Sequence, residues 1–249
     1  MMDSKSYEQY LRETDDWLKT ARARLLHQLV ARHRPSDRPL ELLEVGAGAG
    51  QNLPTLSQFG VVDAIEVNSL GREAINARNV TRSTFAEAVP FPLERRYDVI
   101  CALDVIEHLP DDREALQWMH DLLRPEGLLV ITVPAYQWLF SDHDRALGHF
   151  RRYTRPRLQA ALPPRMDILG AGYFTHFAFP LAVCARAAWS LKRMGRAEPA
   201  KQASPRGRLV ERTLARLHDA ELALIARGYQ PPFGLSAYLV ARRNAASGA

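Results

Sequence analysis

The sequence predicts an α/β fold in which a doubly wound sheet of seven strands carries helices on both faces. Three observations predict it. A strand-like run at residues 42–45 breaks into alternating glycines, and strand and helix patterns then alternate as far as residue 133. Tyr97–Leu103 is almost continuously apolar, which is typical of a parallel strand buried on both faces. Because βαβ crossovers are right-handed, such an alternation closes into one doubly wound sheet.

Each element of the first two thirds has its own signal. The region from about Tyr7 to His33 places apolar residues at amphipathic spacing and predicts a helix, which Pro35–Pro39 ends. We expect strands at Leu40–Val45, Val61–Val67, Val80–Phe85, Tyr97–Leu103 and Leu128–Val133. Helices are expected from Asn52, over Leu70–Arg78 and over Asp111–Leu123, and the turn formed by residues 124–127 precedes the fifth strand.

The C-terminal third departs from this alternation. Met166–Phe174 and Ser236–Arg242 are predicted to be the last two strands, an antiparallel pair. About sixty residues lie between them and predict two inserted helices, at about Phe179–Met194 and Gly207–Ala226. Residues 168–185 carry no formal charge, but Gly170 and other breakers favour a strand and an interfacial helix over a membrane span.

Positive charge is concentrated in this insertion. The whole chain of 249 residues has a formal net charge of +5, whereas residues 186–216 carry seven Arg and two Lys against two Glu, a net charge of +7. Such a segment predicts an anionic partner, and we expect peripheral contact with an anionic membrane through residues 186–216. The charge lies far along the chain from the predicted ligand site, which does not favour nucleic acid as a partner.

Cysteine usage and the N-terminal stretch predict the compartment. Cys101 and Cys184 lie far apart in apolar runs, which predicts buried free thiols and no disulfide framework. The first 16 residues are polar and lack the apolar centre of a signal peptide. We therefore expect a cytoplasmic protein that can contact a membrane peripherally.

The stretch Leu42–Asn52, LLEVGAGAGQN, predicts where a ligand binds. Its alternating glycines allow a tight turn and a close approach of backbone to ligand. Glu66 follows 20 residues after Gly46, where a carboxylate can accept hydrogen bonds from the hydroxyls of a ribose. The spacing is GxGxG rather than the GxGxxG of dinucleotide folds, and Glu44 adds a carboxylate near the loop. The site is therefore expected to suit a cationic nucleoside ligand better than a pyrophosphate.

With ELLEVGAGAG and Glu66, the later motifs LDVIEHL and LLRPEGLLVITVPA make the chain resemble the class I S-adenosylmethionine-dependent methyltransferases over roughly residues 40–154. The resemblance implies a Rossmann-like fold and S-adenosylmethionine as cofactor. It further implies that the cofactor is bound by Glu44, Gly46, Ala47, Gly48, Gly50, Asn52, Glu66, Val67, Asn68, Ala86, Glu87, Leu103, Asp104, Val105 and His108. Relatives often carry an acid for the adenine amine where this chain has Phe85. Phe85 can instead stack on adenine while Glu87 or a backbone carbonyl accepts from the amine, and we favour Ala86 and Glu87 for that part.

The resemblance also implies one domain in four parts. These are a helical cap at residues 1–39, a cofactor-binding core at 40–175, a basic helical insertion or lid at 176–234, and the last strand and tail at 235–249.

The string Asp104-Val-Ile-Glu107-His108 raises the question of a metal. Similar segments in some relatives, including ubiquinone-pathway O-methyltransferases, hold a divalent ion, and carboxylate plus imidazole ligands would suit one. In the other interpretation Glu107 caps a helix and His108 packs under the cofactor. We favour the second interpretation and expect no metal, with a divalent ion as the alternative.

The segment Ser141–Thr154, SDHDRALGHFRRYT, is expected to line the acceptor pocket. It resembles a GHxRRYT segment of a subgroup of bacterial methyltransferases. His143 and His149, together with His108, are the candidate general bases, because an ordinary imidazole titrates near neutral pH. The arginines of this segment either clamp an anionic acceptor or hold the loop on the sheet.

These expectations converge on O-methylation of a small or lipid-linked metabolite with histidine-assisted deprotonation. N- or C-methylation of a small molecule is the nearest alternative. An RNA methyltransferase, a nicotinamide-dependent oxidoreductase and a non-catalytic cofactor-binding partner are less favoured, and the oligomeric state is left open.

Overall fold

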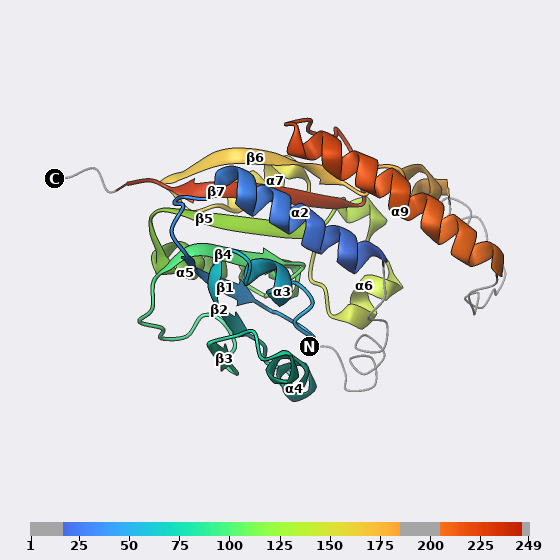
Figure 1. The fold of residues 1–249 in the computed structure, drawn as a ribbon. Helices are drawn as coiled ribbons and strands as arrows, with labels where there is room; N and C mark the ends of the chain where they lie inside the picture. Colours follow the sequence, from blue (N-terminus) through green and yellow to red (C-terminus); the bar gives the residue numbers. More distant parts are fainter. Residues whose placement is uncertain (1–16, 185–204, 246–249) are drawn as a thin grey trace.

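A computed structural model describes residues 17–184 and 205–245, and Figure 1 shows one central sheet with helices on both faces. The strand order is β3-β2-β1-β4-β5-β7-β6. The strands are β1 (Leu40–Val45), β2 (Gly60–Ile65), β3 (Ser83–Phe85), β4 (Tyr97–Leu103), β5 (Leu123–Pro134), β6 (Met166–Phe174) and β7 (Ser236–Arg243). The predicted fold class is confirmed.

The first five strands run parallel, and β7 inserts antiparallel between β5 and β6. The predicted antiparallel pair of last strands is therefore confirmed. Parallel pairing brings the carboxyl ends of β1, β2, β4 and β5 to one edge of the sheet, which is where ligands bind in open α/β sheets.

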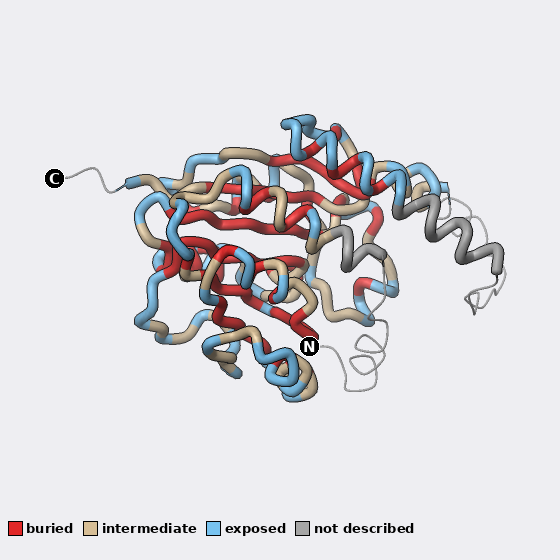
Figure 2. The backbone as a smooth tube through the Cα atoms, viewed as in Figure 1, coloured by how far each residue is buried: buried red, intermediate tan, exposed pale blue. Residues whose placement is uncertain are grey.

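The helices cover the two faces unequally. They are α2 (Trp17–His33), α3 (Leu53–Leu56), α4 (Ser69–Arg78), α5 (Asp112–Leu122), α6 (Asp142–Leu147), α7 (Arg155–Ala161) and α9 (Pro205–Ala226), with 3-10 turns η1 (Ile106–His108) and η2 (Gln137–Leu139). The helices α5 and α7 pack on one face, whereas α2, α3, α4 and α9 pack on the other. Figure 2 shows the buried residues concentrated in the central strands, which are covered on both faces as the apolar run of β4 predicts.

Several predicted boundaries are wrong by a few residues. The strand β2 ends at Ile65, so Glu66 lies just beyond it in a loop, and β3 begins at Ser83. No separate turn precedes β5, because Leu123 already pairs with Tyr97 and the irregularity is taken up in the strand, where Glu126 has φ 65°. The helices α6 and α7 were not predicted. Cys101 is buried as expected, but Cys184 is exposed.

The insertion is partly described. Residues 179–184 are helical and α9 is present, whereas the rest of the first predicted helix, residues 185–194, lies outside the described residues, as does the predicted helix start before Trp17. The two helices α2 and α9 run side by side, with Arg24 pairing with Asp219 and Arg32 Nη1 donating to the Ala226 carbonyl at 2.8 Å. Figure 1 shows α9 projecting past the N-terminal end of α2. Among the described helices, none combines the length and the apolar character that a membrane crossing requires.

Candidate functional site

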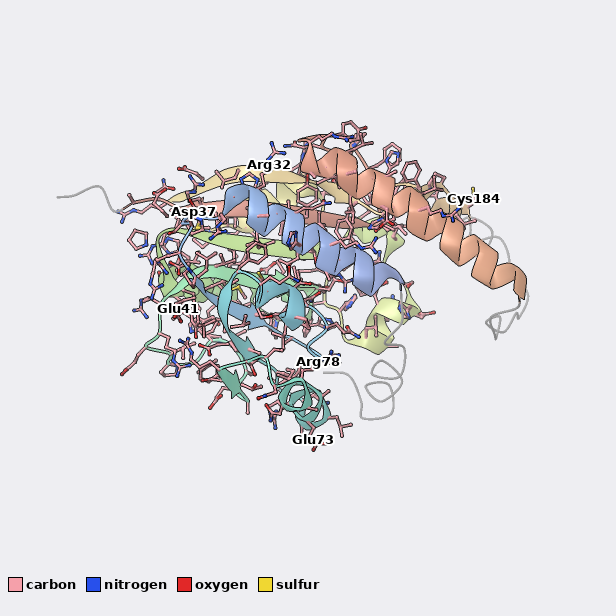
Figure 3. The ribbon with its side chains drawn as sticks, in the orientation of Figure 1. Arg32, Asp37, Glu41, Glu73, Arg78 and Cys184 are labelled. Atoms are coloured by element: carbon pink, nitrogen blue, oxygen red, sulfur yellow. The ribbon has the colours of Figure 1, made fainter. Side chains whose placement is uncertain are left out.

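The glycine loop follows β1 and turns back toward the sheet. Gly46, Gly48 and Gly50 have φ values of 68°, 56° and 72°, in the left-handed region that favours glycine. At Gly46 a Cβ would lie 2.6 Å from Val105 Cγ2, so the absent side chain lets the segment after β4 approach the loop. Arg78, labelled in Figure 3, reaches from the end of α4 and donates to the Ala49 carbonyl at 2.8 Å. The loop is thus held open toward the carboxyl edge.

Glu66 is fixed by this loop. One carboxylate oxygen accepts from the Gly48 backbone N–H at 2.7 Å and the other from the Asn68 backbone N–H at 2.8 Å. Asn68 in turn caps α4 by accepting from Leu70 N–H. Both carboxylate oxygens are thereby oriented by backbone N–H groups at the ends of β1 and β2. Glu66 thus lies between the glycine loop and the start of α4, and its role with the ribose stays a prediction.

Glu44 is buried at the end of β1 beneath the same loop. Its Oε1 accepts from the Asn52 side chain at 2.7 Å, whereas Oε2 has no hydrogen-bond partner among the described residues. Burial, followed by the neighbouring Glu66 carboxylate, raises the pKa of Glu44 to about 8. Without a bound cation, Glu44 is therefore largely protonated near neutral pH. The negative charge that the sequence predicts near the loop forms only when a cation binds or the pH rises.

An ion pair links the N-terminal helix α2 to the same edge of the sheet. Arg22 of α2 makes an ion pair with Asp104, which follows β4 and has φ 55°. Asp104 also accepts from Thr132 Oγ1 at 3.0 Å, and its backbone N–H donates to the Thr132 carbonyl. The N-terminal helix thus contributes Arg22 to the site, which the sequence argument missed because nothing in the helix pattern distinguishes it from the other arginines there.

The predicted adenine side is less enclosed. The Phe85 ring packs against Phe91 with 5.9 Å between ring centroids, and the Arg95 guanidinium carbon lies over the Phe85 ring, 5.7 Å from its centroid. Ala86 and Glu87 are exposed, and Glu87 turns back to accept from the Ala86 backbone N–H. The structure places both residues beside the β2–β3 edge, and their role remains a prediction.

The remaining predicted cofactor residues belong to the same edge. Ala47 donates its backbone N–H to the Ile65 carbonyl, which links the glycine loop to the end of β2. Val67 is exposed after β2, and Leu103 is the last residue of β4. The candidate cofactor residues therefore converge from the ends of three neighbouring strands.

Three side chains meet beside Asp104. One ligand-type atom from each of Glu107, His108 and His149 lies within 4.8 Å of the others. Glu107 is buried, and neither of its carboxylate oxygens has a hydrogen-bond partner among the described residues. Burial and then the Asp104 carboxylate raise the pKa of Glu107 well above its usual range. A buried carboxyl in this state must hold a proton or face a cation, so the donor set fits a divalent metal as well as a proton.

The two histidines of this group stand edge to face, with ring centroids 4.5 Å apart. Burial and the neighbouring His149 lower the pKa of His108 to about 4, so His108 is neutral at physiological pH. The sequence argument linked His108 to Asp104 and Glu107, but it could not foresee that a loop 41 residues later adds His149 to them. His143 lies on the exposed face of α6, outside this group.

The arginines of the GHFRRYT segment hold the loop in place. Arg152 makes two hydrogen bonds to Asp144, at 2.7 and 3.0 Å. Arg151 donates to the Pro110 carbonyl and pairs with Asp112, which also accepts from Tyr153 at 2.6 Å. Of the two predicted roles for these arginines, the structure therefore supports loop anchoring.

Asp144 is, with Arg22, a site residue that the sequence argument did not single out. It is fully buried, caps α6 through Ser141, and accepts a hydrogen bond from His149 Nδ1 at 3.0 Å. Although burial opposes ionisation, the hydrogen bonds from His149 and Arg152 hold the pKa of Asp144 well below its usual range. The available signal was the S-x-x-D capping pattern at residues 141–144.

Comparison with known sequences is consistent with this geometry. The chain is 31% identical over 150 residues to "Methyltransferase str2" of Strobilurus tenacellus and covers 54% of that protein, using 56% of its own length. It is 32% identical over 111 residues to the ubiquinone biosynthesis O-methyltransferase of Ruegeria pomeroyi, covering 42% of that protein with 38% of this chain. The chain thus spans about half the length of these curated relatives.

Solved structures share the fold. The plantazolicin methyltransferase BpumL, determined in complex with SAH, superposes with a TM-score of 0.59 at 15% identity, covering 97% of this chain and 88% of its own. Residues 16–165 match the family described as "Methyltransferase domain". Because the match covers more than half of the chain and includes the glycine loop, Glu66 and the histidine pair, this protein belongs to the methyltransferase domain family.

Proposed function

We propose that this protein transfers the methyl group of S-adenosylmethionine to a hydroxyl oxygen of a small or lipid-linked acceptor. The observation that carries the proposal is the position of His108 and His149 next to Asp104, at the edge of the sheet where Glu66 accepts from the glycine loop. An imidazole at that point can take the proton that an attacking hydroxyl must lose. The O-methyltransferases among the relatives support oxygen over nitrogen as the acceptor atom.

The cofactor would be held by groups already arranged for it. Glu66 would accept from the ribose hydroxyls. Oε2 of Glu44, which has no hydrogen-bond partner within residues 17–184 and 205–245, would face the cationic methionine end. Arg22 would face the cofactor carboxylate from the helix above. S-adenosylmethionine supplies the activated methyl group, while these residues orient it toward the acceptor side.

His149 is the better placed of the candidate bases. His108 has its pKa lowered to about 4 and hydrogen-bonds to the Gly148 backbone, so it is a weak base already engaged with the loop. His149 is oriented by a buried carboxylate, an arrangement that prepares an imidazole for proton transfer. We propose His149 as the base, with His108 shaping its surroundings and His143 taking no direct part.

Apolar rings beyond β5 support an amphipathic acceptor. Tyr136 stacks on Tyr173 with 5.2 Å between ring centroids, and it also packs against Phe179. The Phe179 ring lies edge-on to Trp138, with 6.1 Å between centroids. Trp138, Phe177 and Leu181 are exposed by 54%, 43% and 64%. In sequence, this apolar segment leads into the basic residues 186–216. We propose that the protein is cytoplasmic and binds an anionic membrane peripherally at this side. The lipid-linked acceptor would then reach the site past these rings.

A second mechanism is favoured by a specific observation. Both oxygens of Glu107 are buried without a hydrogen-bond partner among the described residues, beside two imidazoles. Glu107, His108 and His149 would hold a divalent cation, with Asp104 beside them, and such an ion would lower the pKa of a bound acceptor hydroxyl. His149 would then be a ligand rather than the base.

Binding measurements test the cofactor. Calorimetry with S-adenosylhomocysteine is expected to show binding that Glu66→Ala abolishes, and NADH is expected not to bind. Failure of the folded wild-type protein to bind S-adenosylhomocysteine would contradict the proposal.

Transfer assays then separate the two mechanisms. Radiolabelled S-adenosylmethionine should methylate phenolic or hydroxylated acceptors, and His149→Ala should lower turnover by at least about 100-fold. Full activity after exhaustive chelation supports the base mechanism. Activity that is lost on chelation and restored by Mg²⁺, Mn²⁺ or Zn²⁺ supports the metal instead. His149→Ala with unchanged turnover would exclude both roles of His149.

A further inference from the structure

The buried carboxylate of Asp144 contacts one ring nitrogen of His149. Its Oδ1 lies 3.0 Å from His149 Nδ1 and accepts from Arg152 Nε at 2.7 Å. Its Oδ2 accepts from the Ser141 backbone N–H at 2.8 Å, from Ser141 Oγ at 2.9 Å and from Arg152 Nη2 at 3.0 Å. The contacts of Asp144 with Ser141 and Arg152 thus all come from donors, which suits a carboxylate that stays ionised.

An ionised carboxylate cannot donate a hydrogen bond, so His149 Nδ1 must carry the proton. In a neutral imidazole with Nδ1 protonated, Nε2 holds the lone pair. Only a nitrogen with a lone pair can take a proton from an acceptor or bind a metal. The chemistry of His149 therefore depends on which tautomer Asp144 imposes.

We propose that Asp144 is a positioning residue for methyl transfer, which locks His149 in the Nδ1–H tautomer so that Nε2 is the reactive nitrogen. Arg152 and Ser141 keep the carboxylate from rotating, since they hold both of its oxygens. The inference rests on the proposed function for its consequence in catalysis. The tautomer itself is a property of the resting protein and needs neither cofactor nor acceptor.

A purely structural role for Asp144 makes a different prediction. Asp112 provides the comparison, because it anchors the same segment through Tyr153 and Arg151 without touching His149. If Asp144 only holds the loop, Asp144→Asn and Asp112→Asn should behave alike. If it sets the tautomer, only Asp144→Asn should change His149.

The substitution Asp144→Asn has a predictable geometry. Three donors converge on the Oδ2 position and two on Oδ1, so the amide oxygen is expected to stay with Ser141 and Arg152 Nη2. The amide N–H group then faces His149 Nδ1, which must accept, and the proton moves to Nε2. The same substitution in the serine protease triad inverts the histidine tautomer and greatly lowers turnover.

The experiment is two-bond ¹H–¹⁵N correlation NMR of protein labelled with ¹⁵N-histidine, at about pH 8.5 where an ordinary imidazole is neutral. His149 is assigned by the signal lost in His149→Ala. We expect Nδ1–H in the wild-type protein and in Asp112→Asn, but Nε2–H in Asp144→Asn. Turnover of Asp144→Asn should fall by at least about 100-fold with the S-adenosylhomocysteine dissociation constant unchanged.

Either of two results would overturn the proposal. One is an Nε2–H tautomer of His149 in the wild-type protein, which can be read even if Asp144→Asn does not fold. The other is a folded Asp144→Asn protein whose tautomer or turnover matches that of Asp112→Asn. Absence of methyl transfer by the wild-type protein, with the Nδ1–H tautomer present, would instead overturn the proposed function and, with it, only the catalytic consequence drawn here.

Discussion

Two pairs of buried acids, in the sheet and at its carboxyl edge, differ in their hydrogen-bond partners. Asp63 in β2 accepts from Arg82, Arg95 and Tyr97, and Asp98 in β4 accepts from Arg38, Arg124 and the Glu41 backbone N–H. At the carboxyl edge, Glu44 has one oxygen and Glu107 has both oxygens without a hydrogen-bond partner among the described residues.

Their protonation follows from this difference. Although burial opposes ionisation, hydrogen bonds hold the pKa of Asp63 and the pKa of Asp98 below the usual range. Burial without such partners raises the pKa of Glu44 to about 8 and that of Glu107 well above its ordinary value. A buried acid with a full set of donors stabilises the fold, whereas one that lacks donors costs stability and is typical of a binding or catalytic site. Four predictions test this division.

The largest effect on activity is expected at Glu107. Glu107→Gln removes the ionisable group while keeping its volume, and we expect turnover to fall by at least about 100-fold, whether the group handles a proton or a metal. The melting temperature should stay the same or rise, because no hydrogen bond of the carboxylate among the described residues is lost. Radiolabel transfer and thermal unfolding measure both quantities. A stability loss equal to that at Asp63, with full activity, would show that Glu107 is structural.

The largest effect on stability is expected at Asp63. Asp63→Ala leaves Arg82 and Arg95 without their buried partner and should lower the free energy of unfolding by about 3–5 kcal/mol. Urea unfolding measures this loss, with Glu41→Ala as the control. Glu41 also pairs with Arg82 but is partly exposed, so its removal should cost less than about 1 kcal/mol. S-adenosylhomocysteine binding by the folded Asp63 variant should be unchanged, and weakened binding would contradict the division.

A smaller, pH-dependent effect is expected at Glu44. Cationic cofactor favours the ionised carboxylate, so binding should tighten as the pH rises from about 6 to 8, by at most about tenfold per pH unit. Without cofactor, the stability of the fold depends on pH in the opposite direction. The contribution of Glu44 to the free energy of unfolding is fully present below the ordinary glutamate pKa and is lost as the pH rises through about 8. Glu44→Gln should flatten both profiles in calorimetry and urea unfolding. Unaltered profiles in this variant would assign the pH dependence to other groups.

The smallest effect is expected at the partly exposed ion pair of Arg22 with Asp104. Arg22→Ala should change stability by less than about 1 kcal/mol, yet weaken cofactor binding by roughly tenfold, since a hydrogen bond to a charged group contributes about 1.5 kcal/mol or more. Arg24 lies on the same helix as Arg22 and forms an exposed ion pair with Asp219 of α9. Arg24→Ala is therefore the matched control and should leave binding unchanged. Equal binding by both variants would remove Arg22 from the site.

Local sequence patterns predicted much of the candidate site. The glycine loop and Glu66 were found because a strand, a tight turn and an acid at fixed spacing follow one another in the chain. Arg22, Asp144 and the pairing of His149 with Glu107 were not found. Arg22 and the pairing of His149 with Glu107 depend on contacts between residues 82 and 42 positions apart, and such contacts leave no periodic signal. Asp144 contacts His149 only five positions along the chain, but a side-chain contact of this kind has no periodic signal either. The helix α6 was missed for a similar reason, because it is a short helix defined by its capping box rather than by an apolar stripe.

The sequence by itself determined the order of strands and helices, the doubly wound sheet and the position of the cofactor loop, because apolar periodicity and glycine spacing act over a few neighbouring residues. Only the tertiary structure decided which buried acids are neutralised by arginines and which are left facing the site. Protonation of a buried group depends on the donors and the burial that distant segments provide, and these exist only once the chain has folded. The same folding brought His149 next to Glu107 and His108, and it made Arg151 an anchor of the loop through Pro110 and Asp112.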